Sequence, residues 1–488
     1  MGEIVAVVGQ AGTGKTTWLM ERASELAPRF LTADHHHMLA ITRMHGSRRR
    51  LQLKILDSCP AIPFSITTID GFALSLINRW RRSLGYTKPI QPVGDDTEFS
   101  DTIFGTEAGF SHILETSTRL LGSQTVKAVI RESYPLIMID EFQDCHGPLL
   151  DFVKALSDCS ALILAADEFQ LLDSSVDGCP AVEWLQTSGN GSCNLCTLLT
   201  TCHRTSVQGI LDAARCIREN AAADCETIPV ICCPNHGPAA FKIIEALVYN
   251  ASDWQGSTAL ISPSHDEFIR QVLTSCDSQL QKKNLNRISW FHECAAREER
   301  KQLHECLGLE KQDCCSGGWN APTGNLAPAA SQVVTRTQRF SRLRGIKDIP
   351  HGVVARHVDT VVHERRAYCG YSPKRIVTTV HGAKNREFDN VIIVWPYTVP
   401  SDAEQKRRLL YNAITRSKKH CMLLVRGDLQ RATNDPVLSL LGPAKPAFPP
   451  HGKKKTFQKR GRSEMSRHVK NGRWHPNMRF GRTVDEQT

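Results

Sequence analysis

A glycine-rich turn between an apolar strand and a helix is the feature that most constrains this chain. Residues 9–16 read GQAGTGKT and directly follow the apolar run of residues 4–8. In such a turn the glycines let successive backbone N–H groups point inward, and the helix N-terminus adds partial positive charge. The pattern therefore predicts a P-loop that holds the phosphates of a nucleoside triphosphate. The residues expected to contact the nucleotide are Gly9, Gln10, Ala11, Gly12, Thr13, Gly14, Lys15, Thr16 and Thr17.

Two carboxylates at the end of a second apolar strand extend this prediction. Residues 136–139 read LIMI and are followed by Asp140 and Glu141. We expect Lys15 to reach the β- and γ-phosphates, and Thr16 and Asp140 to bind Mg²⁺. Glu141 is then the candidate general base that polarises the attacking water. The alternative is an Asp/Glu pair that only caps a helix.

Alternation of short apolar runs with helical patterns predicts the fold class. Parallel sheets covered by helices on both faces, and hence an α/β protein, are expected. Ten strands are many for one sheet, so two lobes are expected. The expected strands are 4–8, 38–42, 65–69, 136–140, 162–166, 196–201, 258–262, 376–380, 391–395 and 422–425. The expected domains are a first lobe at 1–185 with a small insertion near 85–130, a second lobe at 186–285 and 350–442 with an insertion at 286–349, and a tail at 443–488.

Charge and cysteine content bound the remaining possibilities. The net charge is +10, and residues 443–488 carry +9 of it through twelve Lys/Arg and three acids, which predicts a disordered basic tail. No apolar run approaches the length of a membrane span, and no secretory signal is expected. Eighteen scattered cysteines fit reduced thiols, so a cytoplasmic protein without membrane contact is expected.

Two clusters contain residue types that can bind metals, but each cluster can also be explained without a metal. Cys193, Cys196, Cys202 and His203 could together bind zinc, but the alternation after Cys196 also fits one face of a strand. The run of histidines at 35–37 lies between an expected helix and strand, and we expect it to be a solvated loop.

Beyond the P-loop, a series of motifs in a fixed order resembles the superfamily 1 helicases of the UvrD/Rep/PcrA type. The segment DEFQD at 140–144 resembles motif II of that family. The other matching segments are 38–44 (motif Ia), 67–73 (Ib), 165–170 (III), 201–204 (IV), 379–388 (V) and 410–418 (VI). Together the matches span residues 9–418. The resemblance implies two RecA-like lobes, and the short insertions imply a compact member with reduced 1B and 2B subdomains.

The resemblance also implies roles for individual residues. Arg204 and Arg416 would neutralise charge on the γ-phosphate, Gln170 would sense that phosphate, and Glu387 would face the ribose. Residues implied in DNA binding are Thr42, Arg43, Thr68, Thr379 and His381. ATP, Mg²⁺ and single-stranded DNA or DNA with 3′ tails are the implied ligands. Asn385 stands where the family has glycine, and asparagine is the next best residue at positive φ.

Three functions compete at this point. The first is an ATP-driven motor that moves 3′→5′ on single-stranded DNA. The second is a nucleic-acid-stimulated ATPase that signals to a nuclease partner without unwinding, as in Gabija-type antiphage defence. It is favoured by the short insertions and by the lack of an aromatic residue between Gln170 and Trp184, because stacking aromatics strengthen the grip on single strands. The third is an unrelated P-loop kinase or NTPase, against which the two motif arginines argue.

The tail supplies a prediction. Residues 451–488 interleave basic residues with Phe457, Trp474 and Phe480, which suits phosphate contact and base stacking. Deleting the tail is expected to leave basal ATP hydrolysis intact and to weaken single-strand binding. The slope of log affinity against log salt concentration should flatten by roughly 0.7 for each phosphate that the tail binds. Equal slopes for the two chains, measured by titration at several salt concentrations, would assign the phosphate binding to the core.

Overall fold

The computed structural model describes most of the chain up to Phe448. The described residues are 2–43, 45–93, 98–102, 105–187, 193–264, 267–292, 295–309, 318–322, 324, 326–368 and 374–448. Met44 and residues 449–488, which include most of the expected tail, lie outside them. None of the described helices is long and apolar enough to cross a membrane.

The first large sheet contains the P-loop strand. It has six strands in the order β3-β2-β7-β8-β1-β9, and every neighbouring pair is parallel. The strands are β1 (Ile4–Gly9), β2 (Met38–Thr42), β3 (Phe64–Thr68), β7 (Leu136–Ile139), β8 (Ala161–Ala166) and β9 (Cys193–Leu199). Because β7, β8 and β1 are adjacent, the segments that follow them meet at one edge of the sheet.

Helices cover both faces of this sheet, which explains its continuous apolar strands. Leu136 and Met138 of β7 pack in one core with α1 and α2, while Ile137 and Ile139 pack in another with α3 to α7. The helices are α1 (Lys15–Phe30), α2 (His45–Ser58), α3 (Ile69–Trp80), α4 (Phe110–Leu120), α5 (Gln124–Ser133), α6 (Pro148–Ser157) and α7 (Pro180–Thr187). A small sheet lies between α3 and α4 in the sequence and consists of β4 (Ile90–Val93), β5 (Ser100–Thr102) and β6 (Gly105–Gly109).

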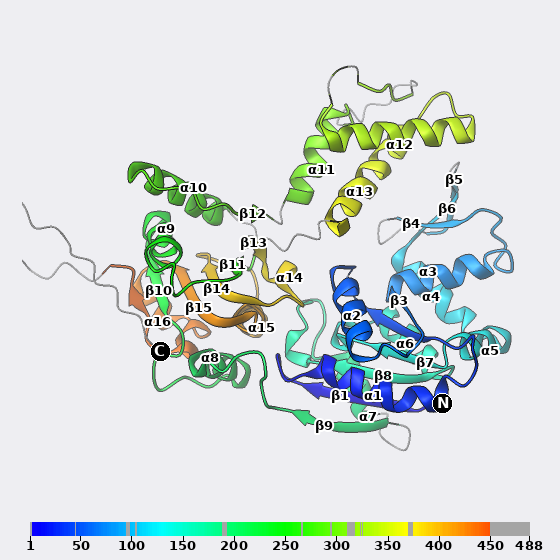
Figure 1. The fold of residues 1–488 in the computed structure, drawn as a ribbon, viewed down its shortest axis with the longest axis horizontal. Coiled ribbons are helices and arrows are strands. Elements are labelled where there is room, and N and C mark those ends of the chain that lie inside the picture. The colour runs from blue at the N-terminus through cyan, green and yellow to red at the C-terminus, as the bar shows by residue number, and fades with distance from the viewer. Residues whose placement is uncertain are drawn as a thin grey trace, which may run out of the picture. The chain divides into compact units, whose positions relative to one another are not determined.

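The second large sheet is also fully parallel. Its seven strands have the order β12-β13-β11-β14-β15-β10-β16. They are β10 (Val230–Cys233), β11 (Thr258–Ser262), β12 (Phe291–His292), β13 (Arg375–Thr379), β14 (Phe388–Trp395), β15 (Ser417–Arg426) and β16 (Lys445–Pro446). One face packs against α8 (Gln208–Glu219) and α15 (Ala403–Ile414), and the other against α9 (His236–Ile244) and α10 (Glu267–Lys282). The short helices α14 (Val380–Ala383) and α16 (Leu429–Asn434) complete this part. The colours of Figure 1 follow the chain from the first sheet in blue and teal to the second in green through orange.

A helical unit is inserted between β12 and β13. It consists of α11 (Ala295–Cys306), α12 (Pro328–Arg344) and α13 (His351–Tyr368), shown in yellow-green and yellow in Figure 1. Val333 of α12, Val358 of α13 and the buried Trp319 belong to one apolar cluster. The insertion therefore extends to Tyr368, whereas the sequence placed its end at residue 349, because α13 buries its valines against α12 and not against the second sheet.

The expected α/β class with parallel sheets is confirmed, and each expected strand is present, although some boundaries differ. The strand β9 pairs with β1, so the first sheet continues past the expected boundary at residue 185. The helix α15 ends at Ile414, because Ser417 begins β15 and pairs with Phe388. Residues 445 and 446 form β16 beside β10, and Ala447 is buried, so residues 445–447 belong to the second lobe and not to the tail expected from residue 443. The tail deletion described above should therefore begin at residue 449, which leaves the second sheet complete.

Asn385 adopts the left-handed conformation that the sequence predicted, with φ of 62°. Replacing it with glycine should maintain or slightly raise the free energy of unfolding, because glycine populates this region freely. Replacing it with valine should lower that free energy by about 1–2 kcal/mol, because a β-branched side chain is strained there. Urea denaturation of the three proteins measures this difference. Equal stability of the glycine and valine variants would contradict the role of backbone conformation at this position.

Candidate nucleotide-binding site

The P-loop has the geometry that its glycines require. Gly12 and Gly14 have φ of 77° and 86°, and α1 begins directly after Gly14. A side chain on Gly9 would lie 2.9 Å from Thr13 Oγ1, and that hydroxyl donates a hydrogen bond to the Gln10 carbonyl at 2.8 Å. The loop is therefore a tight concave turn at the N-terminus of a sixteen-residue helix, which is suited to binding phosphate.

The ammonium group of Lys15 lies inside this turn. Its Nζ donates hydrogen bonds to the carbonyl oxygens of Gly9 and Gln10, at 3.0 and 2.8 Å. The same atom lies 3.7 Å from Oδ2 of Asp167, the residue that follows β8. Lys15 is thus held in the loop by acceptors that a phosphate group would have to replace.

Asp140 lies beside the first turn of α1, as the sequence predicted for a Mg²⁺ ligand. Its Oδ2 accepts a hydrogen bond from the Thr16 hydroxyl at 3.4 Å, and its Oδ1 accepts one from the Glu141 N–H at 3.0 Å. Burial and the neighbouring Glu141 charge raise the pKa of Asp140 to about 7. A carboxylate and a hydroxyl are the hard oxygen donors that Mg²⁺ prefers, so these two side chains fit that ion.

Glu141 is held in an unusual conformation by a buried glutamine. Its φ is 60°, a region that residues other than glycine seldom occupy and that is enriched at functional sites. Gln143 Nε2 donates a hydrogen bond to a Glu141 carboxylate oxygen, and Gln143 Oε1 accepts one from the Asp167 N–H at 2.9 Å. Gln143, to which the sequence assigned no role, therefore fixes Glu141 relative to the end of β8.

Gln170 and Arg416 meet in the structure although 246 residues separate them. Arg416 Nη2 donates a hydrogen bond to Gln170 Oε1 at 3.2 Å, and Gln170 Nε2 donates one to Asp167 Oδ2 at 2.8 Å. Arg416 is only 2% exposed, and burial followed by the nearby Arg204 charge lowers its pKa to about 10. The guanidinium remains charged at neutral pH and connects the second sheet to the P-loop lobe.

Arg204 and Glu387 also lie together. Arg204 Nε donates to Glu387 Oε1 at 2.8 Å, and its Nη1 donates to the Thr415 carbonyl at 2.7 Å. The Arg204 segment crosses the P-loop, because a side chain on Gly12 would lie 2.9 Å from Arg204 Cβ. Lys418 forms a second ion pair with Glu387 at 2.9 Å. The residue expected at the ribose is therefore bound to two cations beside the loop.

The residues predicted to bind DNA lie at the carboxyl ends of strands. Thr68 and Thr379 end β3 and β13, and each hydroxyl accepts a hydrogen bond at 3.1 Å from the first turn of the next helix. Arg43 pairs with Asp70 at 2.9 Å, and Thr42 at the end of β2 is 1% exposed. His381 is hydrogen-bonded to the Leu172 backbone, and its burial lowers its pKa. Two of the three threonine hydroxyls thus act as helix caps.

Several contacts between the lobes of the two large sheets were not predicted from the sequence, and three of them involve the P-loop or the acids beside it. The Tyr411 hydroxyl accepts a hydrogen bond from the Ala11 N–H of the P-loop at 3.0 Å. Lys384 Nζ lies 2.6 Å from both carboxylate oxygens of Asp144. Arg218 of α8 pairs with Asp167 at 2.7 Å. Tyr411, Lys384 and Asp144 stand inside the motifs, but no motif or periodicity marks Arg218.

Two members of the cysteine cluster that suggested zinc, Cys202 and His203, lie beside the P-loop. Cys202 Sγ lies beside Gly12, and the His203 N–H donates to the Gly12 carbonyl at 2.7 Å, so both residues contact the P-loop. The side chains of Cys193 and Cys196 lie outside the described residues.

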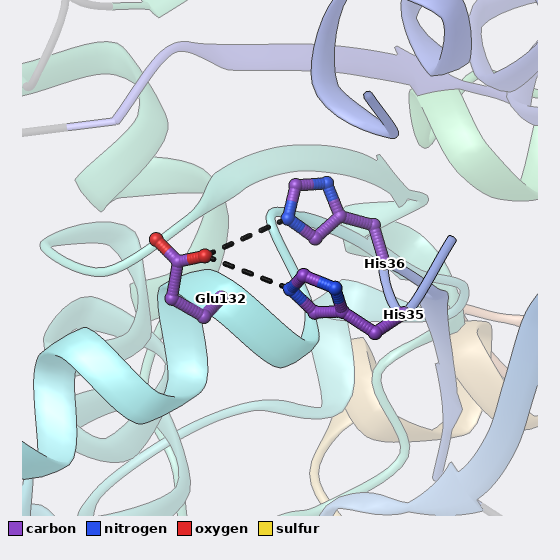
Figure 2. A group of neighbouring side chains, drawn as sticks. All are labelled: His35, His36 and Glu132. Atoms are coloured by element: carbon purple, nitrogen blue, oxygen red, sulfur yellow. Dashed lines mark ion pairs between the residues drawn. The ribbon is translucent and has the colours of Figure 1, made fainter. Parts of the chain in front are cut away.

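Among the described residues, His35, His36 and Glu132 form the one group of three or more His, Cys, Asp or Glu side chains whose ligand atoms lie close enough together for a metal ion (Figure 2). His36 Nδ1 accepts hydrogen bonds from the N–H groups of Thr32 and Ala33, at 3.1 and 3.2 Å. The neutral ring therefore carries its hydrogen on Nε2, which faces Glu132 at 3.8 Å and is not available to a metal. The predicted loop position is correct, but the His36 side chain is only 12% exposed, and the group joins this loop to α5.

Two parallel α/β sheets with a P-loop and carboxylates at adjacent strand ends define a P-loop NTPase architecture. Residues 376–424 match the family model of the UvrD-like helicase C-terminal domain. This segment runs from β13 into β15 and contains His381, Glu387 and Arg416. The resemblance of the chain to UvrD-like superfamily 1 helicases is therefore confirmed.

Similarity to individual proteins is remote. No curated protein matches the chain significantly in sequence. The arterivirus nonstructural protein 10 helicase is 12% identical with a TM-score of 0.31, and the match covers 86% of this chain and 59% of that one. The arterivirus nonstructural protein 10 helicase in complex with DNA is 12% identical with a TM-score of 0.32, and the match covers 90% of this chain and 63% of that one. The PRRSV helicase is 13% identical with a TM-score of 0.31, and the match covers 88% of this chain and 54% of that one. The chain thus spans less than two thirds of the length of these helicases.

The Glu387 ion pairs predict a pH-dependent contribution to stability. Burial would raise the pKa of Glu387, but Arg204 and Lys418 outweigh it and lower the pKa to about 2. A depressed carboxyl pKa stabilises the fold above the ordinary value of 4.5, and this contribution is lost as the pH falls toward 2. The side chain is 40% exposed, so Glu387→Gln should lower the free energy of unfolding at pH 7 by only about 0.5–1 kcal/mol. Urea denaturation at pH 7, 5 and 3 should show this difference shrinking, whereas a constant difference would contradict the ion-pair assignment.

Proposed function

We propose that this protein is an ATP-driven translocase of superfamily 1 that moves 3′→5′ on single-stranded DNA. The observation that carries the proposal is the hydrogen bond between Gln170 and Arg416. It places a buried cation of the second lobe against a side chain that is itself hydrogen-bonded to Asp167, and Asp167 lies 3.7 Å from Lys15. Nucleotide chemistry at the P-loop would then be sensed across the two lobes, as a motor requires.

In this proposal the chain's own residues supply most of the hydrolytic site. Lys15 binds the β- and γ-phosphates, and Thr16 and Asp140 would hold Mg²⁺, which neutralises charge on those phosphates. Glu141 accepts a hydrogen bond from the attacking water and orients it toward the γ-phosphate. Gln143 supports this role because it holds the Glu141 carboxylate in place.

Two arginines stabilise the transition state in this scheme. Arg416 is desolvated and charged, so its field acts in a low-dielectric environment where it is strong. Arg204 is held by Glu387 and the Thr415 carbonyl directly over Gly12. Both would contact charge that develops on the γ-phosphate, and Gln170 would report its presence to Arg416.

DNA would bind along the carboxyl ends of β2, β3 and β13. Arg43 supplies the positive charge there, and the threonines at positions 42, 68 and 379 mark the strand ends. Nucleotide binding and hydrolysis would change the contacts between the lobes. The two sheets would then bind the DNA strand alternately and so move it.

A second function, a DNA-stimulated ATPase that acts on a nuclease partner, is favoured by one observation. Trp184 packs edge-on against Phe142, with 5.8 Å between ring centroids, and lies at the margin of the first lobe's core. It therefore does not replace the base-stacking aromatics that this part of the chain lacks. Without them, each base forgoes stacking that is worth roughly 1–3 kcal/mol.

The hydrolytic assignment predicts that Glu141→Gln retains ATP binding and loses ATP turnover by about 10²-fold or more, because the group that orients water is neutralised. A steady-state phosphate-release assay and a nucleotide-binding titration measure the two properties. Glu115→Gln, an exposed substitution on α4, is the matched control and should leave both unchanged. Near wild-type turnover in Glu141→Gln would remove Glu141 from the proposed site.

A strand-displacement assay separates the two functions. Duplexes with a 3′ tail, a 5′ tail and no tail are incubated with the full chain and ATP, beside an ATPase assay with the same DNA. The translocase predicts unwinding of the 3′-tailed duplex alone. DNA-stimulated hydrolysis without displacement of any strand would favour the partner-directed ATPase.

A further inference from the structure

Asp167 is a completely buried carboxylate that lies between two cations from different parts of the chain. Its Oδ1 accepts a hydrogen bond from Arg218 at 2.7 Å, and its Oδ2 lies 3.7 Å from Lys15 Nζ. Gln170 Nε2 donates to the same Oδ2 at 2.8 Å. These cations lower the pKa of Asp167 although burial alone would raise it, so the group is an anion.

Arg218 is fixed by its surroundings. Its guanidinium also donates to Glu168 at 3.2 Å and to the Tyr411 hydroxyl at 3.5 Å. The rings of Phe169 and Tyr411 flank it, with centroids 5.5 and 5.7 Å from the guanidinium carbon. Since the side chain is only 12% exposed, water does little to screen the pair with Asp167.

The two cations of Asp167 have different tasks. Lys15 must leave Asp167 and the Gly9 and Gln10 carbonyls to bind phosphate. Arg218 has no place in the P-loop and stays on Asp167. If Arg218 were absent, Lys15 would be the only cation among the described residues that is paired with this buried anion. Moving Lys15 would then leave that charge uncompensated, which is strongly unfavourable.

We propose that Arg218 is a positioning residue that neutralises Asp167 and thereby frees Lys15 to bind the phosphates of the nucleotide. This inference rests on the proposed function only in that a nucleotide binds at the P-loop. It makes nucleotide affinity depend on a residue of α8 that is bound to Asp167 and not to the nucleotide.

Titration of the full chain with a fluorescent ATP analogue tests the inference. Arg218→Ala and Arg218→Gln should each weaken binding by about 10- to 100-fold, the range of coupling between distinct sites. Arg218→Lys, which keeps the charge, should recover part of the affinity. Arg215→Ala, an exposed substitution one turn earlier on α8, is the matched control and should bind like the wild type.

A second substitution distinguishes charge neutralisation from a merely structural bond between α8 and the β8 end. Asp167→Asn removes the anion that retains Lys15, so Arg218→Ala/Asp167→Asn should recover the affinity that Arg218→Ala alone loses and bind the analogue within about threefold of Asp167→Asn. If Arg218 were only a structural contact, the double variant would bind as weakly as Arg218→Ala or more weakly. Thermal melting of each variant confirms that the chains compared are folded.

The outcomes also separate this inference from the proposed function. If Lys15→Ala bound the analogue as well as the wild type, the P-loop assignment itself would be wrong. If binding required Lys15 but was unchanged in Arg218→Ala and Arg218→Gln, only the role of Arg218 would be overturned. Failure of Asp167→Asn to restore binding in the double variant would overturn it equally.

Discussion

The parallel order β7-β8-β1 is the constraint on which the proposed site depends. Parallel strands end at the same edge of a sheet, so the segments that follow these three neighbouring strands lie close together whatever the sequences of the loops. Asp140 follows β7, Asp167 follows β8 and the P-loop follows β1. The Thr16–Asp140 and Lys15–Asp167 contacts are direct consequences of that order. A different strand order would have separated the same residues.

Several polar contacts between the lobes of the two large sheets are largely removed from water. Asp167 with Arg218, Asp144 with Lys384 and Gln170 with Arg416 each pair a group of the first lobe with a cation of the second. Burying a charge without a partner is far more unfavourable than exposing it, so these pairs favour one arrangement of the lobes over others. Because Lys15 and Asp167 belong to the same network, phosphate that moves Lys15 would change the balance of charge at this boundary. Under the proposed function, this would provide a physical route from nucleotide binding to lobe movement.

Local patterns predicted the parts of the site that lie close together in sequence. The P-loop, the apolar strand before Asp140 and the positive φ at Asn385 each follow from the stereochemistry of a few adjacent residues. Boundaries were less predictable where a segment's partner is distant. The insertion extends to Tyr368 because α13 packs against α12, and residues 445–446 form a strand because β10 lies beside them. Neither partner is visible from the segment itself.

The sequence alone determined the α/β class and the glycine-rich turn between β1 and α1, and it indicated the acids and arginines that could serve a phosphate there. These depend on hydrophobic periodicity, glycine stereochemistry and motif order, which are properties of contiguous residues. Only the tertiary structure decided that Gln143 holds Glu141, that Tyr411 contacts the P-loop and that Arg218 meets Asp167. Arg218 is one of several arginines on amphipathic helices, and most such residues are solvated. Arg218 differs from them because α8 packs on the second sheet with this residue facing the end of β8. Water is excluded there, and the ion pair with Asp167 is therefore stronger than a solvated one.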